Sequence, residues 1–162
     1  MNNISIDFLQ RLIEVSKKKY VLLKDIHKLT QVQTEVISGS DIEKLEELIK
    51  GKQGSIDSIS KLDEEFGIYF KRLKQTLGVE SLDEIKDIEI QGVKELRTVI
   101  GDIMTLLREI SELEVNNNKS AKRLLEDIGD NIKKINAGHK ANSIYNTAYN
   151  VETPSYFIDK KK

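Results

Sequence analysis

The sequence predicts an all-α protein: an elongated antiparallel helical hairpin with a long third helix packed along it, ending in a mobile C-terminal tail. Three observations indicate this three-helix, coiled-coil-like bundle. The 162 residues contain a single proline, so little interrupts helix formation. Apolar residues recur at steps of three and four over long stretches. Charged residues make up 33% of the chain and aromatic residues only 6%, which is typical of long helices with narrow apolar seams.

The first helix is predicted from about Ile4 to Ile37. Glycine in the Ser-Gly-Ser turn at 38–40 should close it, because glycine readily adopts the left-handed conformation that ends many helices. Ser40 and Glu43 then match a capping box, which predicts the start of the next helix. The first seam comprises Leu9, Leu12, Ile13, Tyr20, Leu23, Ile26, Leu29 and Val36.

The second helix carries the clearest seam, and it should end at Gly78. Gly51 and Gly54 interrupt it, at a cost of about 1 kcal/mol each relative to alanine. These glycines predict either a close helix contact or a soft point in the helix. The seam comprises Leu45, Ile49, Lys52, Ile56, Ile59, Leu62, Phe66, Phe70, Leu73 and Leu77.

A capping box at Ser81 and Glu84 predicts a short helical turn, and the longest periodic stretch follows it. This third helix is predicted from Val93 to Ile135 and should be on the order of 70 Å long. Its seam comprises Val93, Leu96, Ile100, Ile103, Leu107, Ile110, Ala121, Leu124, Ile128 and Ile135.

Glu114 and Asn117 stand where that seam should be apolar, within a stretch that also contains Asn116 and Asn118. Two interpretations are open. Polar seam residues can fix the register of packed helices at some cost in stability. Alternatively, the helix runs past its partners at this level and is solvated.

The segment after Ile135 has a different character, because Gly138 and Pro154 stop a continuous helix. We therefore expect a helical bundle at 1–137 and a flexible, partner-binding tail at 138–162. Burying seven apolar tail residues gains about 1.5–3 kcal/mol each, while ordering roughly 15 residues costs about 1–2 kcal/mol each. The sum is near zero or unfavourable, which favours a tail that orders on a partner; the alternative is that its aromatic residues fold back on the bundle.

The predicted partner-binding residues are the apolar and aromatic side chains of this tail, the residue types that dominate interface energetics. Tyr145 and Tyr149 are four residues apart, as are Ile144 and Ala148, so each pair would share one side of a short helix. The full predicted set is Ile144, Tyr145, Ala148, Tyr149, Val151, Tyr156, Phe157 and Ile158.

The charge balance argues against a nucleic-acid partner, because 26 basic and 27 acidic residues are interleaved and leave no large basic face. The basic run at 17–19 is predicted to be a solvated helix face. No apolar run approaches about 18 residues and the N-terminus lacks a signal-peptide pattern, so we expect no membrane insertion and a cytoplasmic location.

No catalytic motif is present, which predicts a protein that is not an enzyme. The chain has no cysteine, and neither His27 nor His139 has a glutamate three residues before it, as a di-metal helical bundle would need. We therefore predict no catalytic residues, no metal site and no cofactor.

Three stretches resemble the FlgN-like flagellar export chaperones. They are the second-helix segment from Ile42 to Ile49 with Lys52, Gln53, Ile56, Ile59, Leu62 and Asp63; the linker Leu77-Gly78-Val79 with Ser81 and Leu82; and the ending Tyr156-Phe157-Ile158-Asp159-Lys160-Lys161. The asparagine run at 116–118 is more polar than the seam usual in that family.

This resemblance implies a cytoplasmic type III export chaperone that binds the hook-filament junction (hook-associated) proteins before secretion. Such a chaperone keeps their terminal helices from premature association and delivers them to the flagellar export apparatus. The resemblance also implies that the C-terminal part engages these partners. The alternative is a structural or scaffolding coiled coil acting through helix–helix association. Homodimer formation is left open by the sequence.

Overall fold

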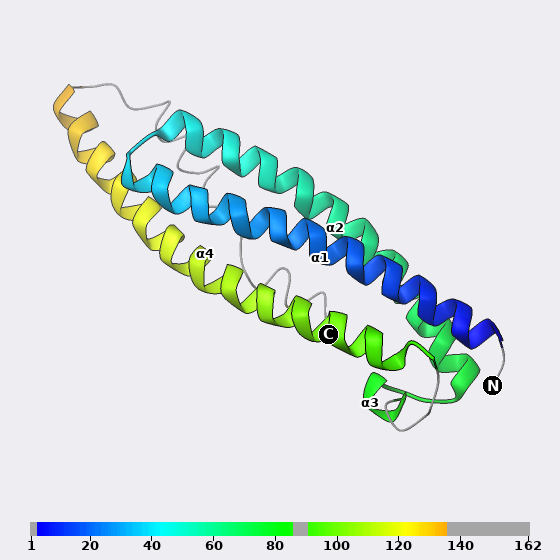
Figure 1. Ribbon diagram of the computed structural model, residues 1–162. Coiled ribbons are helices and arrows are strands. Elements are labelled where there is room, and N and C mark those ends of the chain that lie inside the picture. Colours follow the sequence, from blue (N-terminus) through cyan, green and yellow to red (C-terminus); the bar gives the residue numbers. More distant parts are fainter. Residues whose placement is uncertain (1–2, 86–90, 136–162) are drawn as a thin grey trace. The chain divides into compact units, whose positions relative to one another are not determined.

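Three long helices and one short helix make up the computed structural model, which describes residues 3–85 and 91–135 (Figure 1). They are α1 (Asn3–Ser38), α2 (Ile42–Leu77), α3 (Leu82–Ile85) and α4 (Val93–Ile135). The described residues contain no β-strand, so the all-α prediction is confirmed. The predicted tail at 138–162 lies outside the described residues.

The helices contribute to two compact units, each assembled from separate stretches of the chain. The first unit combines the chain up to Lys24 with Ile56–Leu106. The second unit combines Asp25–Ser55 with the described residues from Leu107 to Ile135. Each unit therefore takes one stretch from each of α1, α2 and α4.

The core of the first unit brings the start of α1 against the end of α2 and the start of α4, so α1 and α2 are antiparallel there. Gly92, just before α4, has a φ of 99°. The positive φ favours glycine here, and a Cβ at this position would press on Cδ1 of Ile13 at 3.2 Å. The buried core comprises Leu9, Leu12, Ile13, Leu73, Val93 and Leu96, with Phe66, Tyr69, Phe70 and Ile100 packed around it.

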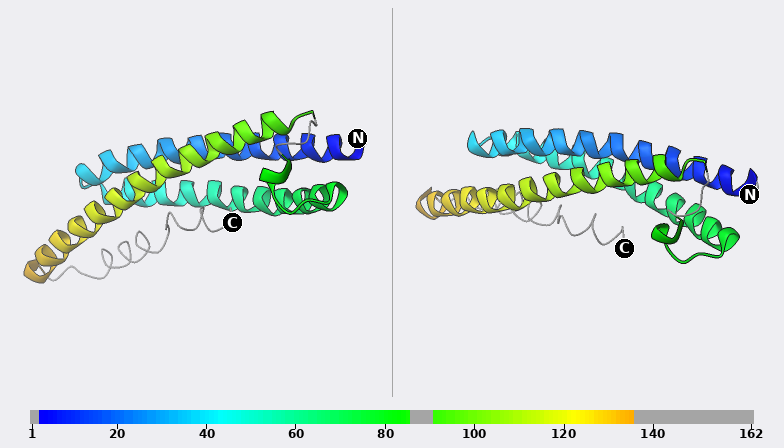
Figure 2. Two further views of the ribbon diagram at one scale, coloured as in Figure 1. Left: turned by 90° about the horizontal axis from the view of Figure 1, so that it is seen from below. Right: turned by 60° about the horizontal axis from the view of Figure 1, so that its bottom comes forward.

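The core of the second unit lies beside the turn between α1 and α2, where the chain reverses direction (Figure 2). Ser40, not Gly39, adopts the left-handed conformation, with a φ of 57°. The Ser40 amide donates to the Ile37 carbonyl, and the Asp41 amide to the Val36 carbonyl. These two bonds form a Schellman motif that closes α1. The core residues of this unit are Val36, Ile37, Leu45, Ile49 and Ala121.

The predicted capping box at Ser40 and Glu43 is therefore wrong. Asp41 caps α2 instead, because its Oδ1 accepts a hydrogen bond from the Lys44 amide at 3.1 Å. With Ser40 already in the left-handed conformation that closes α1, the next residue takes the capping role. The second predicted box is confirmed in part: the Glu84 carboxylate accepts from the Ser81 and Glu80 amides.

The glycines of α2 do not mark a close helix contact, so that alternative is wrong. A Cβ at Gly51 or Gly54 would meet no atom within 4 Å, because both positions face solvent. Gly78 ends α2 as predicted, with a φ of 69° and the Val79 amide donating to the Lys74 carbonyl.

Candidate partner-binding site

The partner-binding residues predicted in the tail lie outside the described residues, so their arrangement stays a prediction. They are Ile144, Tyr145, Ala148, Tyr149, Val151, Tyr156, Phe157 and Ile158. The described residues offer a different surface that a partner can contact, in the first unit.

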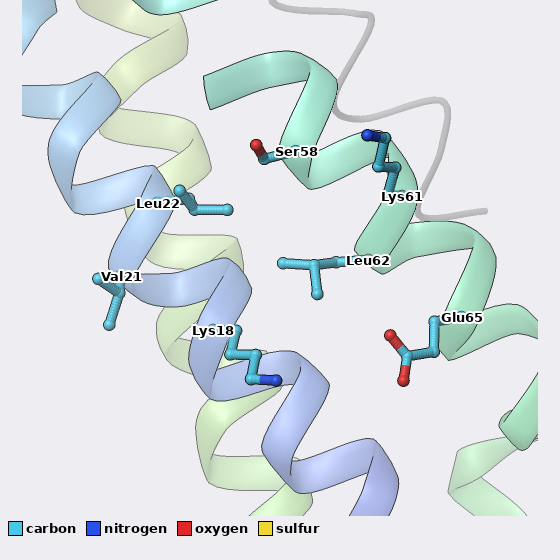
Figure 3. Close-up of a pocket in the computed structure, with 7 residues that line it drawn as sticks. All are labelled: Lys18, Val21, Leu22, Ser58, Lys61, Leu62 and Glu65. Atoms are coloured by element: carbon cyan, nitrogen blue, oxygen red, sulfur yellow. The ribbon is translucent and has the colours of Figure 1, made fainter. Parts of the chain in front are cut away.

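This surface is an open groove between α1 and α2, with a volume of about 560 Å³ (Figure 3). Leu22 of α1 and Leu62 of α2 point toward each other across it, and Lys18 and Glu65 stand on its two sides at one end. We call it the α1/α2 groove. It is lined by Lys18, Val21, Leu22, Ser58, Lys61, Leu62 and Glu65.

The groove has an apolar floor and unpaired charges at its rim. Leu22 and Leu62 are half-buried, whereas Val21 is 58% exposed. Lys18, Lys61 and Glu65 are exposed, and none of the three forms an ion pair within the described part of the chain. An apolar floor with a charged rim is the usual composition of a protein-binding surface.

Next to the groove, the basic run at 17–19 divides between solvent and core. Lys17 and Lys18 are exposed as predicted, and Lys17 forms an ion pair with Glu95 at 2.7 Å. The prediction of a solvated face is wrong for Lys19, whose side chain is 2% exposed and lies 2.7 Å from Asp63 Oδ1. One residue along a helix turns the side chain by about 100°, which carries Lys19 from the rim into the helix interface.

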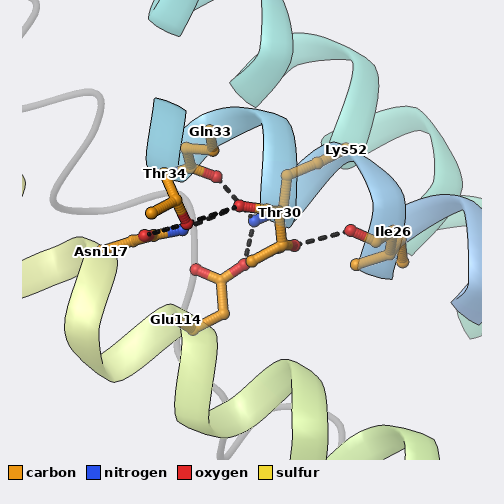
Figure 4. Close-up of polar contacts among 7 residues, drawn as sticks. All are labelled: Ile26, Thr30, Gln33, Thr34, Lys52, Glu114 and Asn117. Atoms are coloured by element: carbon orange, nitrogen blue, oxygen red, sulfur yellow. Dashed lines mark hydrogen bonds and ion pairs between the residues drawn. The ribbon is translucent and has the colours of Figure 1, made fainter. Parts of the chain in front are cut away.

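The second unit contains a buried polar cluster that joins all three long helices (Figure 4). Lys52 of α2 and Glu114 of α4 form an ion pair, and each side chain is only 1% exposed. The Lys52 ammonium also donates to Oε1 of Gln33, on α1, at 3.0 Å. The Thr30 hydroxyl lies 3.2 Å from Glu114 Oε1 and 2.6 Å from the Ile26 carbonyl, and its one proton can serve only one of them at a time.

Asn117 extends this cluster one turn further along α4. Its amide nitrogen donates to the Thr30 carbonyl at 3.0 Å, and its oxygen accepts from the Thr34 hydroxyl at 2.7 Å. Glu114 and Asn117 are thus buried against α1, and the interpretation that this level of α4 is solvated is wrong for them. Asn116 is exposed and Asn118 half-buried. Partner-specific bonds of this kind fix the register between helices.

Sequence reasoning missed the α1/α2 groove, although the sequence carries a signal for it. Val21 and Leu22 are apolar but lie off the α1 seam formed by Leu23 and Ile26, so α1 has more apolar surface than one seam needs. Leu62 was assigned to the α2 seam, whereas its side chain is half-buried and lines the groove.

Residues 3–85 and 91–135 contain no group of three or more His, Cys, Asp or Glu side chains that could hold a metal ion. No helix in the described part of the chain is long and apolar enough to span a membrane.

Helices joined through apolar seams, with an apolar groove left open between two of them, define an all-α protein whose surface suits a partner helix. Comparison with known protein families identifies which kind of helical protein this is. The family model described as FlgN protein matches residues 1–153. The chain therefore belongs to the FlgN family, a family of flagellar export chaperones and not of enzymes. Neither the curated proteins nor the solved structures give a significant match.

Proposed function

We propose that this chain is a cytoplasmic export chaperone that binds the hook-filament junction proteins and delivers them to the flagellar type III export apparatus. The observation that carries the proposal is the FlgN family match, which spans residues 1–153 of 162. The junction proteins and the export apparatus are the partners that the resemblance of the sequence implies.

The physical task of such a chaperone is to cover amphipathic helices that would otherwise associate with one another. A terminal helix of a junction protein exposes its apolar stripe to solvent until the protein polymerises. Burying that stripe on the chaperone prevents early assembly. This binding needs no nucleotide and no metal ion. Competition at the export apparatus would release the client.

We further propose that residues 1–137 form the helical body and that residues 138–162 form a tail that contacts the client. Support for the tail comes from its composition: three of the five tyrosines of the chain, Tyr145, Tyr149 and Tyr156, lie in these 25 residues. Buried tyrosines are common among the residues that dominate protein interfaces.

The test is a calorimetric titration of purified hook-filament junction proteins from the same organism into the full-length chaperone and into the chain ending at Ala137. We expect the full-length protein to bind at least one junction protein and the shortened chain to bind it far more weakly. If the full-length protein binds none of them, the proposed function is wrong. Equal binding by both chains would instead remove the tail as the contact site.

A pair of matched variants sharpens the assignment within the tail. Replacing Tyr145 and Tyr149 together by serine should weaken client binding roughly 30-fold or more, because truncating one dominant aromatic contact costs about 2 kcal/mol. The control replaces Asn146 and Asn150, one position further along, by serine and should bind like the wild type. Equal losses in both variants would contradict the role given to the tyrosines.

A further inference from the structure

We infer that the α1/α2 groove docks one amphipathic helix whose apolar stripe is flanked by acidic side chains, and that a client of the chaperone supplies this helix. The inference rests on the proposed function and adds to it a contact surface within the helical body. Three features of the first unit support it: the groove's shape, its rim charges and its continuation along α2.

The shape suits a helix because two antiparallel helices already form the walls. Leu22 and Leu62 provide an apolar floor between α1 and α2, and Val21 leaves 58% of its surface exposed beside it. In α1, Leu22 is rotated by about 100° from the core residue Leu23, so the groove and the core use different sides of the helix. A third helix with apolar residues at steps of three and four would cover this floor as helices do in bundles.

The rim charges select the flanks of that helix. Lys18 on α1 and Lys61 on α2 stand on opposite walls, and neither has an ion-pair partner among the described residues. Glu65 is the one acidic group of the lining, so the rim carries a net charge of +1 (two lysines minus one glutamate). A docked helix with acidic residues on both flanks would meet one lysine on each side, which favours association and fixes orientation.

The same charges argue against the chain's own tail as the occupant. Residues 138–162 contain four lysines and two acidic residues, a net charge of +2. A positive tail is a poorer match for a positive rim than an acidic helix from another protein. A second copy of this chain is the other candidate occupant of the groove, and light scattering distinguishes it from a client helix.

The apolar surface continues past the groove along α2. Lys61, Glu65 and Ile68 follow one another at steps of four and three, so they lie along one side of that helix. Ile68 is 53% exposed and extends the apolar contact by one turn. The docked helix therefore has room for at least two turns of contact along the α1/α2 pair.

The experiment compares two double charge reversals by titration with the purified hook-filament junction proteins. The test variant carries Lys18→Glu and Lys61→Glu. The control carries Lys94→Glu and Lys122→Glu, which changes the net charge equally at exposed lysines of α4, outside the groove lining, that have no ion pair within residues 3–85 and 91–135. We expect the test variant to bind the client about tenfold more weakly than the control in about 0.05 M salt, and the gap to narrow in about 0.5 M salt.

A second pair of variants tests the apolar floor. Val21→Glu should weaken client binding about tenfold or more, whereas Val115→Glu, at a 44% exposed valine of the second unit, should leave it unchanged. Both substitutions are at exposed positions, so both variants should keep their helices, which circular dichroism checks.

The outcomes distinguish a failure of the groove inference from a failure of the proposed function. If the wild type binds a junction protein and all four variants bind it equally, the groove inference is overturned while the proposed function stands. If the wild type binds no junction protein, the proposed function fails and this inference fails with it. Light scattering tests whether a second copy of this chain occupies the groove. If the wild type is a dimer that Val21→Glu converts to a monomer while client binding is unchanged, the inference is overturned in favour of a second copy.

Discussion

The buried ion pair between Lys52 and Glu114 yields a sharp prediction about stability. Each side chain is 1% exposed, and among the described residues the Lys52 ammonium donates otherwise only to the neutral Gln33 oxygen, at 3.0 Å. Glu114→Leu therefore leaves a buried ammonium without its carboxylate, which costs about 3–5 kcal/mol. Lys52→Met leaves the carboxylate unpaired in the same way and should cost a similar amount.

The double variant Lys52→Met with Glu114→Leu removes both charges and should lie within about 2 kcal/mol of the wild type. Replacing a complete buried ion pair by apolar residues of similar size is often neutral or stabilising by about 1–4 kcal/mol. This gain is offset because the Gln33 oxygen loses its hydrogen-bond donor, which costs about 1–3 kcal/mol. The two substitutions should thus be strongly non-additive.

Urea unfolding followed by circular dichroism measures the four free energies of this double-mutant cycle. An exposed pair serves as the control: Lys50 and Glu46 are 3.7 Å apart, and Lys50→Met should change stability by no more than about 0.5 kcal/mol. A loss below about 1 kcal/mol for Glu114→Leu, or additive losses in the double variant, would show that the two side chains are not a buried, coupled ion pair.

Three further predictions concern single backbone positions, and all are checked by the same unfolding measurements. Ser40→Gly should stabilise by about 1 kcal/mol because it relieves a left-handed serine, whereas Gly39→Ala, with ordinary contacts and no positive φ, should show no comparable gain. Gly92→Ala should destabilise by more than about 1 kcal/mol, since its φ is positive and the new methyl group would press on Ile13. Gly54→Ala should stabilise by about 1 kcal/mol, and a loss there would mean that this face of α2 is covered.

The helices themselves could be predicted from the sequence because their signal is local. The first helix was expected from Ile4 to Ile37 and spans Asn3–Ser38, and the third was expected from Val93 to Ile135, where α4 lies. Apolar spacing along one stretch is enough to define such a helix. The end of α2 was equally local, since Gly78 alone supplies the left-handed residue.

The roles of Glu114 and Asn117 could not be predicted in the same way, because their partners are distant in sequence. Lys52 lies 62 positions before Glu114, and Thr34 lies 83 before Asn117. A polar residue in a seam is compatible with both burial and solvation until the facing helix is known. The prediction for Lys19 was wrong for the same reason, because burial of its ammonium depends on the ion pair with Asp63 at 2.7 Å.

The α1/α2 groove could not be predicted even from knowledge of which helices face each other. Leu22 and Leu62 each fit an ordinary helical pattern, and nothing in that pattern says which side chains a third helix leaves uncovered. The aromatic residues of the tail differ in this respect, because composition alone marks them as candidates for partner binding.

The interleaved make-up of the two units limits how deletion mapping can be interpreted. Shortening the chain from its C-terminus to any point between Leu107 and Ile135 removes part of α4 from the second unit. Such a fragment would lose the carboxylate facing Lys52 if the cut precedes Glu114, and the cover over Leu45 and Ile49 if it precedes Ala121. Its failure to retain a client would then report a collapsed scaffold and not a missing contact, so point substitutions are the safer way to map binding.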